Sequence, residues 1–322
     1  MEFYDQWLKN GHHGEMTYLE RHRNLKAAPE TWLPFAKSAL VFAIPYLPLA
    51  AENIKSDYVT GKTLAARTAL YVDYARDQTD YHATISEELN PVLLELRERY
   101  PGAKFQLALD AQPVLERDLA VRAGLGWIGK NTCVLDRLGG SLFFIAEILT
   151  SLETDEAALE VQDFCGTCTR CLDACPTKAL VAPRVLDATK CISYWTIESK
   201  KIPPKDLRSK FGDWFFGCDI CQTVCPWNIK VHGANRMMPL PSDREQLVSD
   251  LRFILQGSNR EIERRFENTP MVRARPFGLK RNALIVAGNL KLNELAANIE
   301  ALFNSERLGQ LAKEIHAELV VV

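Results

Sequence analysis

The pattern of apolar and polar positions predicts alternating strands and helices over the N-terminal half of the chain. Residues 1–36 are polar and aromatic, which indicates short helices and loops. Apolar runs predict buried strands over 38–47 (SALVFAIPYL), 104–109 (KFQLAL) and 141–150. Helical patterns lie between them, over 64–100 with a break at Asn90-Pro91, and over 114–123. This alternation is typical of an α/β domain.

The remainder of the chain divides into a cysteine-rich segment and a helical segment. Residues 163–229 hold all the cysteines but one and have few long apolar runs, because metal–thiolate bonds can replace part of a core. Apolar residues then recur at helical spacing over 243–256, 259–267, 278–289, 292–303 and 306–318. Short helices in series predict a HEAT-like region. We therefore expect an α/β domain over 1–157, a two-cluster domain over 158–234 and a helical region over 235–322.

Composition and charge narrow the class of protein. The 322 residues are 47% hydrophobic and carry a net charge of −2, so any nucleic-acid contact must be a local basic patch. No apolar run approaches the length of a membrane span, and Met1–Asp5 carries acid where a signal peptide needs base. We expect a cytoplasmic monomer without a membrane partner. In that reducing environment the nine cysteines are better metal ligands than disulfide partners.

Eight of the nine cysteines follow the spacing of bacterial two-cluster ferredoxins. A C-x2-C-x2-C-x3-C-P run begins at Cys165, and a C-x2-C-x3-C-P run follows Cys191. In such ferredoxins the last cysteine of a run binds the other cluster. The spacing therefore predicts two 4Fe–4S clusters. One is held by Cys165, Cys168, Cys171 and Cys225, and the other by Cys175, Cys191, Cys218 and Cys221.

A zinc site is a weaker alternative to the clusters. A zinc site on two CxxC pairs would leave four cysteines unused, among them both Cys-Pro pairs. Cys133 is left over, and we interpret it as a small buried hydrophobe. Because most of the chain lies outside the cluster segment, we expect the electrons to be used by the same protein, after delivery by an external low-potential donor.

The glycine-rich segment 124–131 (GLGWIGKN) matches two nucleotide-binding patterns poorly. It follows a predicted helix, whereas a dinucleotide fingerprint follows a strand. Asn131 stands where a phosphate loop needs Ser or Thr for magnesium. Two interpretations remain: a tight turn that brings the backbone close to another element, and the one we favour, a turn whose amides and Lys130 contact some other large cofactor.

Asp110 ends the predicted strand 104–109, in the stretch LDAQPVLER. The ends of strands in α/β folds commonly carry catalytic groups. The alternative is that Asp110 caps the N-terminus of the helix predicted from Val114. Residue chemistry alone leaves both interpretations open.

Five stretches give the chain a family resemblance: HGEMTYLERH (13–22 with His13 first), LALDAQPVLERDLAVRAGLGWIGKNT (107–132), FCGTCTRCLDACPTKAL (164–180), CISYWTIES (191–199) and GCDICQTVCPWN (217–228). In order and spacing they resemble the epoxyqueuosine reductases, and PFGLKRNALIVAGN (276–289) resembles the HEAT-like segment of that family. The resemblance implies a reductive-dehalogenase-like cobalamin domain, and a reaction that converts epoxyqueuosine at the tRNA wobble position to queuosine. It makes Asp110 the proton donor, with a pKa that we expect an apolar site to raise. From their places in the motifs, Lys130, Asn131 and Ser193 are expected to contact cobalamin.

Two basic runs are candidate contacts to the tRNA backbone. They contribute Lys200, Lys201 and Arg208, and Arg273, Arg275, Lys280 and Arg281. Trp195, Trp214 and Trp227 could stack an unpaired base, although core packing is the expected role of at least two of them. The alternatives are a cobalamin and iron–sulfur reductase of a small molecule, and an iron–sulfur electron carrier whose α/β part is a docking module.

Overall fold

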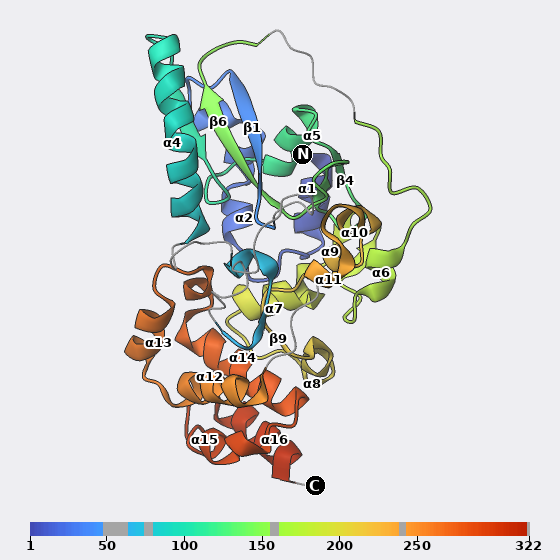
Figure 1. The fold of residues 1–322 in the computed structure, drawn as a ribbon, viewed down its shortest axis with the longest axis vertical. Helices are drawn as coiled ribbons and strands as arrows, with labels where there is room; N and C mark the ends of the chain where they lie inside the picture. The colour runs from blue at the N-terminus through green and yellow to red at the C-terminus, as the bar shows by residue number, and fades with distance from the viewer. Residues whose placement is uncertain (48–63, 74–79, 155–160, 238–242, 321–322) are drawn as a thin grey trace.

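A three-stranded sheet forms the centre of the N-terminal part of the computed structural model, which describes residues 1–47, 64–73, 80–154, 161–237 and 243–320 (Figure 1). Its strands are β1 (Ser38–Pro45), β3 (Phe105–Ala108) and β6 (Phe143–Thr150), in the order β1-β6-β3. The three predicted strands are confirmed. Both pairings are antiparallel, with Thr150 opposite Ser38 and Phe105, and β6, the last of these three strands in the chain, lies between the other two.

Helices cover both faces of this sheet. Helix α4 (Tyr81–Arg99) packs Ile85, Leu89 and Leu93 against the face that carries Ala146 and Ile148. Helix α5 (Glu116–Arg122) lies on the other face, where Val114 and Leu119 meet Leu149. The alternation of side chains along β6 explains this division, since neighbouring residues of a strand point to opposite faces. Three short N-terminal helices lie beside the sheet, α1 (Glu2–Lys9), α2 (Tyr18–Arg21) and α3 (Arg23–Ala27).

The long helix predicted over 64–100 is wrong in its first half. Residues Arg67–Thr68 form β2, which pairs in parallel with β9 (Trp214–Phe216), and Leu70–Asp73 form a 3₁₀ turn. Part of the expected helix, 74–79, lies outside the described residues. The predicted break at Pro91 is also wrong, because α4 continues through it. Pro91 is on the exposed side of the helix, where a missing backbone N–H donor is tolerated more easily.

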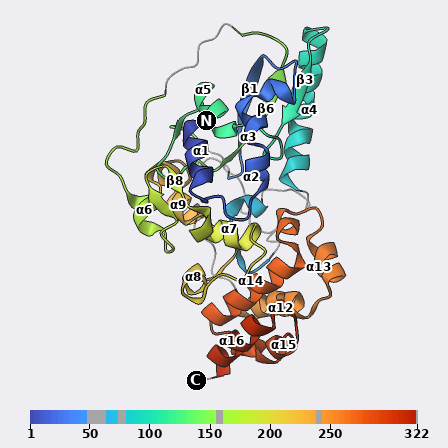
Figure 2. The ribbon, with the colours of Figure 1, turned by 180° about the vertical axis from the view of Figure 1, so that it is seen from behind.

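The cysteine-rich segment consists of short elements. Its helices are α6 (Arg170–Ala174), α7 (Ile192–Ile197), α8 (Lys205–Arg208), α9 (Ile220–Thr223), α10 (Pro226–His232) and α11 (Ala234–Met237). The strands β7 (Leu180–Ala182) and β8 (Val185–Leu186) form a hairpin. Helices α6 and α9 lie side by side in both views (Figures 1 and 2). The boundary expected at 157–158 lies outside the described residues.

The C-terminal part is helical, as predicted. It contains α12 (Arg244–Gln256), α13 (Asn259–Phe266), α14 (Arg275–Asn289), α15 (Ala296–Glu300) and α16 (Gly309–Val320). Helix α14 is buried along most of its length, because α12, α13 and α16 all pack against it. Its core continues into α7, β9 and residues 64–72, so the N-terminal half contributes to this second core. Among the described helices, none is long and apolar enough to cross a membrane.

Candidate active site

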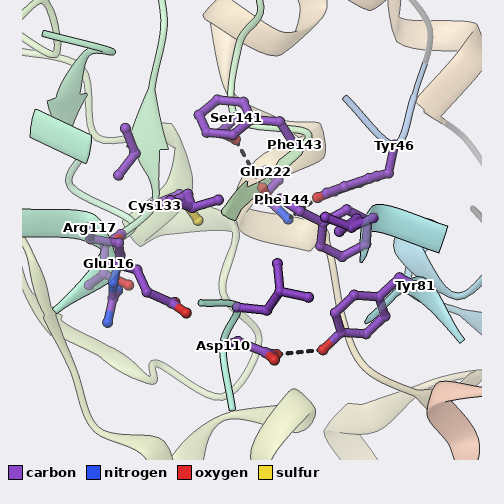
Figure 3. A pocket seen from close by; sticks show the side chains of 15 residues that line it. Tyr46, Tyr81, Asp110, Glu116, Arg117, Cys133, Ser141, Phe143, Phe144 and Gln222 are labelled. Carbon is purple, nitrogen blue, oxygen red and sulfur yellow. Dashed lines mark hydrogen bonds between the residues drawn. The ribbon is translucent and has the colours of Figure 1, made fainter. Parts of the chain in front are cut away.

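A cavity of about 360 Å³ opens where β3 ends and α4 begins (Figure 3). Aromatic and aliphatic side chains form most of its wall, and a few polar groups converge on it. In Figure 3, Tyr46, Tyr81 and Phe144 lie on one side, and Glu116, Arg117 and Cys133 on the other. Apolar walls with a small number of polar groups are typical of ligand and cofactor sites.

Asp110 lies on this cavity, two residues after the end of β3. The interpretation of Asp110 as a helix cap is wrong, because α5 is preceded by Leu115 and has no side-chain cap. The carboxylate instead accepts hydrogen bonds from the hydroxyl of Tyr81 and from Nε2 of His82, the latter at 2.5 Å. Both partners stand in the first turn of α4.

His82 links Asp110 to a second carboxylate. Asp80 caps α4 by accepting the backbone N–H of His82 at 2.9 Å, and its side chain also contacts Nδ1 of the ring. Because both ring nitrogens face carboxylates, hydrogen bonds to Asp110 and Asp80 raise the pKa of His82 to about 10, although burial lowers it. The ring is therefore an imidazolium at neutral pH.

The pKa of Asp110 is lowered, contrary to the expectation from sequence. Burial raises this pKa, but hydrogen bonds from His82 and Tyr81 outweigh burial. Tyr81 keeps its proton, since burial and the Asp110 charge both raise its pKa. Its ring stacks on His82 at 4.1 Å and on Phe144 at 4.5 Å between centroids, which fixes the hydroxyl. The resting site thus holds an ionised Asp110 and a proton on His82.

Sequence reasoning did not identify Tyr81 and His82. The apolar spacing predicts one helix over 64–100, which places Asp80-Tyr81-His82 in the middle of that helix. The available signal was Asp80, a favoured helix N-cap that places the next two residues at the start of a helix.

Three further groups border the cavity. Burial and the Asp110 charge raise the pKa of Glu116 to about 7. Burial raises the pKa of Cys133 to about 12, so its thiol keeps its proton and is unsuited to nucleophilic attack, as predicted. Arg117 donates to the carbonyl of Thr132 at 2.7 Å and so ties α5 to the glycine-rich segment.

The structure brings eight cysteines together in two sets of four, next to one another. The first set contains Cys165, Cys168, Cys171 and Cys225; burial, followed by neighbouring thiols of the same set, raises the pKa of Cys171 and Cys225. The second contains Cys175, Cys191, Cys218 and Cys221; burial, followed by neighbouring thiols, raises the pKa of Cys191, Cys218 and Cys221. In the described residues, no three ligand side chains converge tightly enough for a single metal ion. Thiols around a larger centre are the geometry that a cubane cluster needs.

The two sets differ in their surroundings. Gly166, Thr167, Thr169 and Arg170 are exposed, and they lie between the cysteines of the first set. Phe216, Gly217 and Asp219 surround Cys218 of the second set and are buried. Asp219 has its pKa raised to about 6 by burial, and it accepts the N–H of Leu70 at 2.6 Å. The loop that carries Cys165, Cys168 and Cys171 is thus close to solvent, whereas Cys225 of the same set is buried.

The glycine-rich segment forms a tight turn. Trp127–Ile128 (β4) pairs with Val134–Leu135 (β5), and a Cβ atom added to Gly126 would lie 1.9 Å from the carbonyl oxygen of Leu135. This close approach of two backbones excludes any side chain at Gly126. The first interpretation of the segment, a turn between close elements, is therefore the observed one.

The three residues expected to contact cobalamin do not line the cavity. Lys130 donates to the carbonyls of Gly166 at 2.6 Å and Cys168 at 2.9 Å, in the loop of the first cysteine set. Asn131 is buried and donates to the carbonyl of Cys221 at 3.2 Å. Ser193 lies on α7, where its carbonyl accepts from Thr196. Lys130 and Asn131 therefore support the two cysteine loops.

Two residues of the basic runs are wrongly predicted as phosphate contacts. Arg281 is 1% exposed and donates to the carbonyls of Ser199, Lys201 and Trp195. Arg208 is 6% exposed and pairs with Glu314. A buried guanidinium with these partners holds the interior together and is not accessible to a phosphate.

The other basic residues lie nearer the surface. Lys200, Lys201 and Arg275 are exposed, and burial lowers the pKa of the half-buried Lys280. Arg273 is exposed, pairs with Glu198 at 2.5 Å and is among the charges that lower the pKa of Asp110. The indoles of Trp195 and Trp214 are buried in the core, as expected for at least two of the three tryptophans.

Comparisons with known proteins agree with one another. The family profile described as "4Fe-4S double cluster binding domain" matches residues 164–228. Curated epoxyqueuosine reductases are similar over most of the chain: that of Cyclobacterium marinum is 38% identical over 73% of both chains. That of Cellulophaga algicola is 36% identical over 86% of both, and that of Pseudomonas aeruginosa 36% over 88% of this chain and 76% of its own.

Solved structures share the fold. A crystal structure of epoxyqueuosine reductase with an epoxyqueuosine-modified tRNA-Tyr stem loop has a TM-score of 0.70 at 28% identity, over 90% of this chain and 76% of that one. The Streptococcus thermophilus epoxyqueuosine reductase has a TM-score of 0.77 at 24% identity, over 99% and 84%. The identities over most of the chain decide the family. The chain belongs to the epoxyqueuosine reductases and is an oxidoreductase with a double iron–sulfur cluster domain.

Proposed function

We propose that this enzyme reduces epoxyqueuosine at the wobble position of a tRNA anticodon to queuosine. The observation that carries the proposal is the Asp110–His82–Tyr81 group, which faces an aromatic cavity beside two sets of four thiols. The reaction removes one oxygen from an epoxide and leaves an alkene and water. Its balance needs two electrons and two protons, so a proton-holding group must lie beside a one-electron relay.

The eight cysteines would supply the electron relay. We propose that the first set binds one 4Fe–4S cluster and the second set the other. The segments that we propose as domains are 1–157 for catalysis, 158–234 for the clusters and 235–322 for contact with tRNA.

The cavity lining fits a large, mostly apolar cofactor such as cobalamin. Tyr46, Phe143 and Phe144 offer flat apolar surfaces, and Arg117, Ser141 and Gln222 offer polar groups at the rim. A corrinoid is larger than 360 Å³, so these residues would hold only part of it. When bound, cobalamin would supply a strongly reducing cobalt centre for the epoxide carbon. Lys130, Asn131 and Ser193, which do not line the cavity, would then influence the cofactor by holding the neighbouring loops in position.

Asp110 would deliver the proton to the epoxide oxygen. Since its carboxylate is ionised at rest, the proton comes from His82, whose Nε2–H points at Asp110. Tyr81 donates to the other carboxylate oxygen and holds Asp110 toward the cavity. A solved Bacillus subtilis epoxyqueuosine reductase is described with an aspartate catalytic loop swung out of the active site. Asp110 likewise lies in a loop, which supports this role.

The phosphates of the substrate would be met by the exposed and half-buried basic residues. The remaining candidates for these contacts are Lys200, Lys201, Arg273, Arg275 and Lys280. Of these, Arg273 is the one whose charge lowers the pKa of Asp110. The solved epoxyqueuosine reductase that shares this fold was crystallised with an epoxyqueuosine-modified tRNA stem loop, which supports an RNA substrate.

The test is anaerobic purification from cells supplied with cobalamin, followed by metal analysis and turnover. We expect about eight irons and one cobalt per chain, since each cubane holds about four irons. Incubation with epoxyqueuosine-containing tRNA and a reductant should give nucleosides that lack one oxygen. Asp110→Asn should keep the metal content and lose turnover by on the order of 100-fold or more.

The alternatives predict different results. A small-molecule reductase would hold iron and cobalt but would not bind unmodified tRNA. An electron carrier would hold iron without cobalt, and Asp110→Asn would be silent in it. Full turnover by Asp110→Asn would contradict the role of Asp110 as proton donor while leaving the substrate assignment intact.

A further inference from the structure

We propose that the exposed surface around the first cysteine set is the docking site of a small acidic electron-carrier protein. Four cations define this surface, which we call the basic rim: Arg137, Arg170, Lys178 and Lys230. The inference rests on the proposed function, because it supplies the electrons that the reaction consumes.

The rim surrounds the part of the first set that is nearest to solvent. Arg137 lies over the ring of Phe164 at 4.8 Å, and Lys230 over that of Trp227 at 5.4 Å. These two rings are 5.8 Å apart and pack with Cys165 and Cys225. Arg170 opens α6 between Cys168 and Cys171. Lys178 follows Cys175 of the second set, and its ammonium donates to the carbonyl of Asp173 in α6 at 3.3 Å. Each cation is thus tied to a cysteine loop.

The charge of the rim is not balanced locally. None of the four cations makes an ion pair with another described residue. Of the nearby described acids, Asp163 is paired with Arg184. Asp136 and Asp173 accept hydrogen bonds from neutral donors and keep their negative charges, so the four cations exceed these two carboxylates by two charges. In a chain with a net charge of −2, this is a local positive surface that attracts an acidic partner.

An exposed leucine stands inside this charged surface. Leu138 is 81% exposed, the highest value for a large apolar side chain among the described residues. It lies next to Arg137 in a turn held rigid by Asp136, which bonds to the N–H groups of Leu138 and Gly139. A small apolar centre with a charged rim is typical of transient complexes between redox proteins. The leucine favours a protein partner over RNA, because an RNA backbone would not cover it.

The position of the rim separates it from the substrate side. In both views, α6 lies at one side of the molecule and α4 with α13 at the other (Figures 1 and 2). Asp110 is bonded to the first turn of α4. A carrier at α6 would therefore leave the cavity open for a large substrate. In the transfer, the carrier loses one electron and the oxidised first cluster gains it.

The test measures reduction of the clusters directly, by stopped-flow absorbance of the cluster-loaded protein mixed with reduced flavodoxin, an acidic carrier. The double variant Arg137→Glu/Lys230→Glu should lower the second-order rate constant by on the order of 10-fold or more at low salt. The difference should shrink as salt rises, because the Debye length falls to about 8 Å at 0.15 M. Leu138→Gln should lower the rate constant at every salt concentration.

The controls separate docking from damage. Lys313→Glu reverses an exposed cation on α16, remote from α6, and should leave the rate unchanged. Reduction by dithionite should be equal in all variants. If Arg137→Glu/Lys230→Glu lowers the cluster content, the double variant Arg170→Glu/Lys178→Glu provides the test instead. Its two side chains make no cation–ring contacts among the described residues.

An unchanged flavodoxin rate in both double variants would overturn the proposal. If the same variants also weakened the binding of unmodified tRNA, the rim would be an RNA contact instead. Rim-dependent reduction without turnover of epoxyqueuosine-containing tRNA would instead support the docking site and refute the proposed substrate.

Discussion

Glu147 should make the stability of this protein fall as the pH rises. The residue lies on the central strand β6, opposite Val41 and Ala108, and it is 0% exposed. Neither carboxylate oxygen has a hydrogen-bond partner. The ammonium of Lys26, a nearby cation, donates to the carbonyl of Val114 at 2.7 Å. A carboxylate in such a place is costly, so the group takes up a proton.

The magnitude follows from the pKa. Burial, followed by the charge of Glu116, raises the pKa of Glu147 from 4.5 to about 8. Between these values the folded protein binds a proton that the unfolded chain has lost. The corresponding contribution to the free energy of unfolding is fully present below about pH 4.5 and is lost as the pH rises through about 8. The difference between the two pKa values corresponds to at most about 5 kcal/mol.

Glu147→Gln tests this reasoning, because glutamine has nearly the same size and no charge. Relative to the wild type, the variant should gain little at pH 5 and up to about 5 kcal/mol above pH 8. Thermal unfolding of the cluster-loaded protein, followed anaerobically by circular dichroism from pH 5 to 9, would measure the difference in Tm. Glu95→Gln, at an exposed position of α4, is the matched control and should show no such trend. A Tm difference for Glu147→Gln that does not change with pH would refute the argument.

Three further predictions concern the site and its supports. His82 should stay charged until the pH rises through about 10, so kcat should fall only there. The variant His82→Asn should lower kcat by on the order of 100-fold and remove that limb of the pH–rate profile. Gly126→Ala should cost about 1–3 kcal/mol, measured as a lower Tm, because its methyl group would meet the carbonyl of Leu135. Arg281→Met should cost about 3–5 kcal/mol by leaving buried carbonyls unpaired, whereas the exposed Arg275→Met should cost little in the same melt.

Local patterns in the sequence predicted the elements whose side chains all face one core. Strands β1, β3 and β6 follow apolar runs, and α12, α13 and α14 follow helical periodicity, because each buries one continuous face. The segment 64–72 has apolar residues at spacings that suit a helix equally well. In the structure it pairs with β9 and packs Leu64, Ala69 and Val72 into the C-terminal core. That partner is more than 100 residues away in the chain, so no local pattern could indicate it.

The residues of the site also divide into those that the local sequence indicates and those that only the fold brings together. The grouping of the cysteines follows from short spacings, and Asp110 follows from its place at a strand end. The proton on His82 depends on two carboxylates, Asp80 and Asp110, of which one is distant in sequence. Charge runs gave the least information, because Arg275 and Arg281 stand on the same helix yet one is exposed and the other buried. Burial is a tertiary property, and it decides whether a cation can reach a phosphate.

Under the two proposals made above, the placement of charge would let one chain serve two anionic partners. An RNA and an acidic carrier are attracted by the same kind of surface, so a single basic patch would make them compete. In this molecule the basic rim borders α6, whereas Arg273 pairs with Glu198 and belongs to the 3₁₀ turn Pro270–Ala274, which contacts α13. Two separate patches in a chain of net charge −2 would let the carrier dock while the substrate stays bound. Because each turnover needs two electrons delivered singly, simultaneous binding removes the need to release a half-reduced substrate between deliveries.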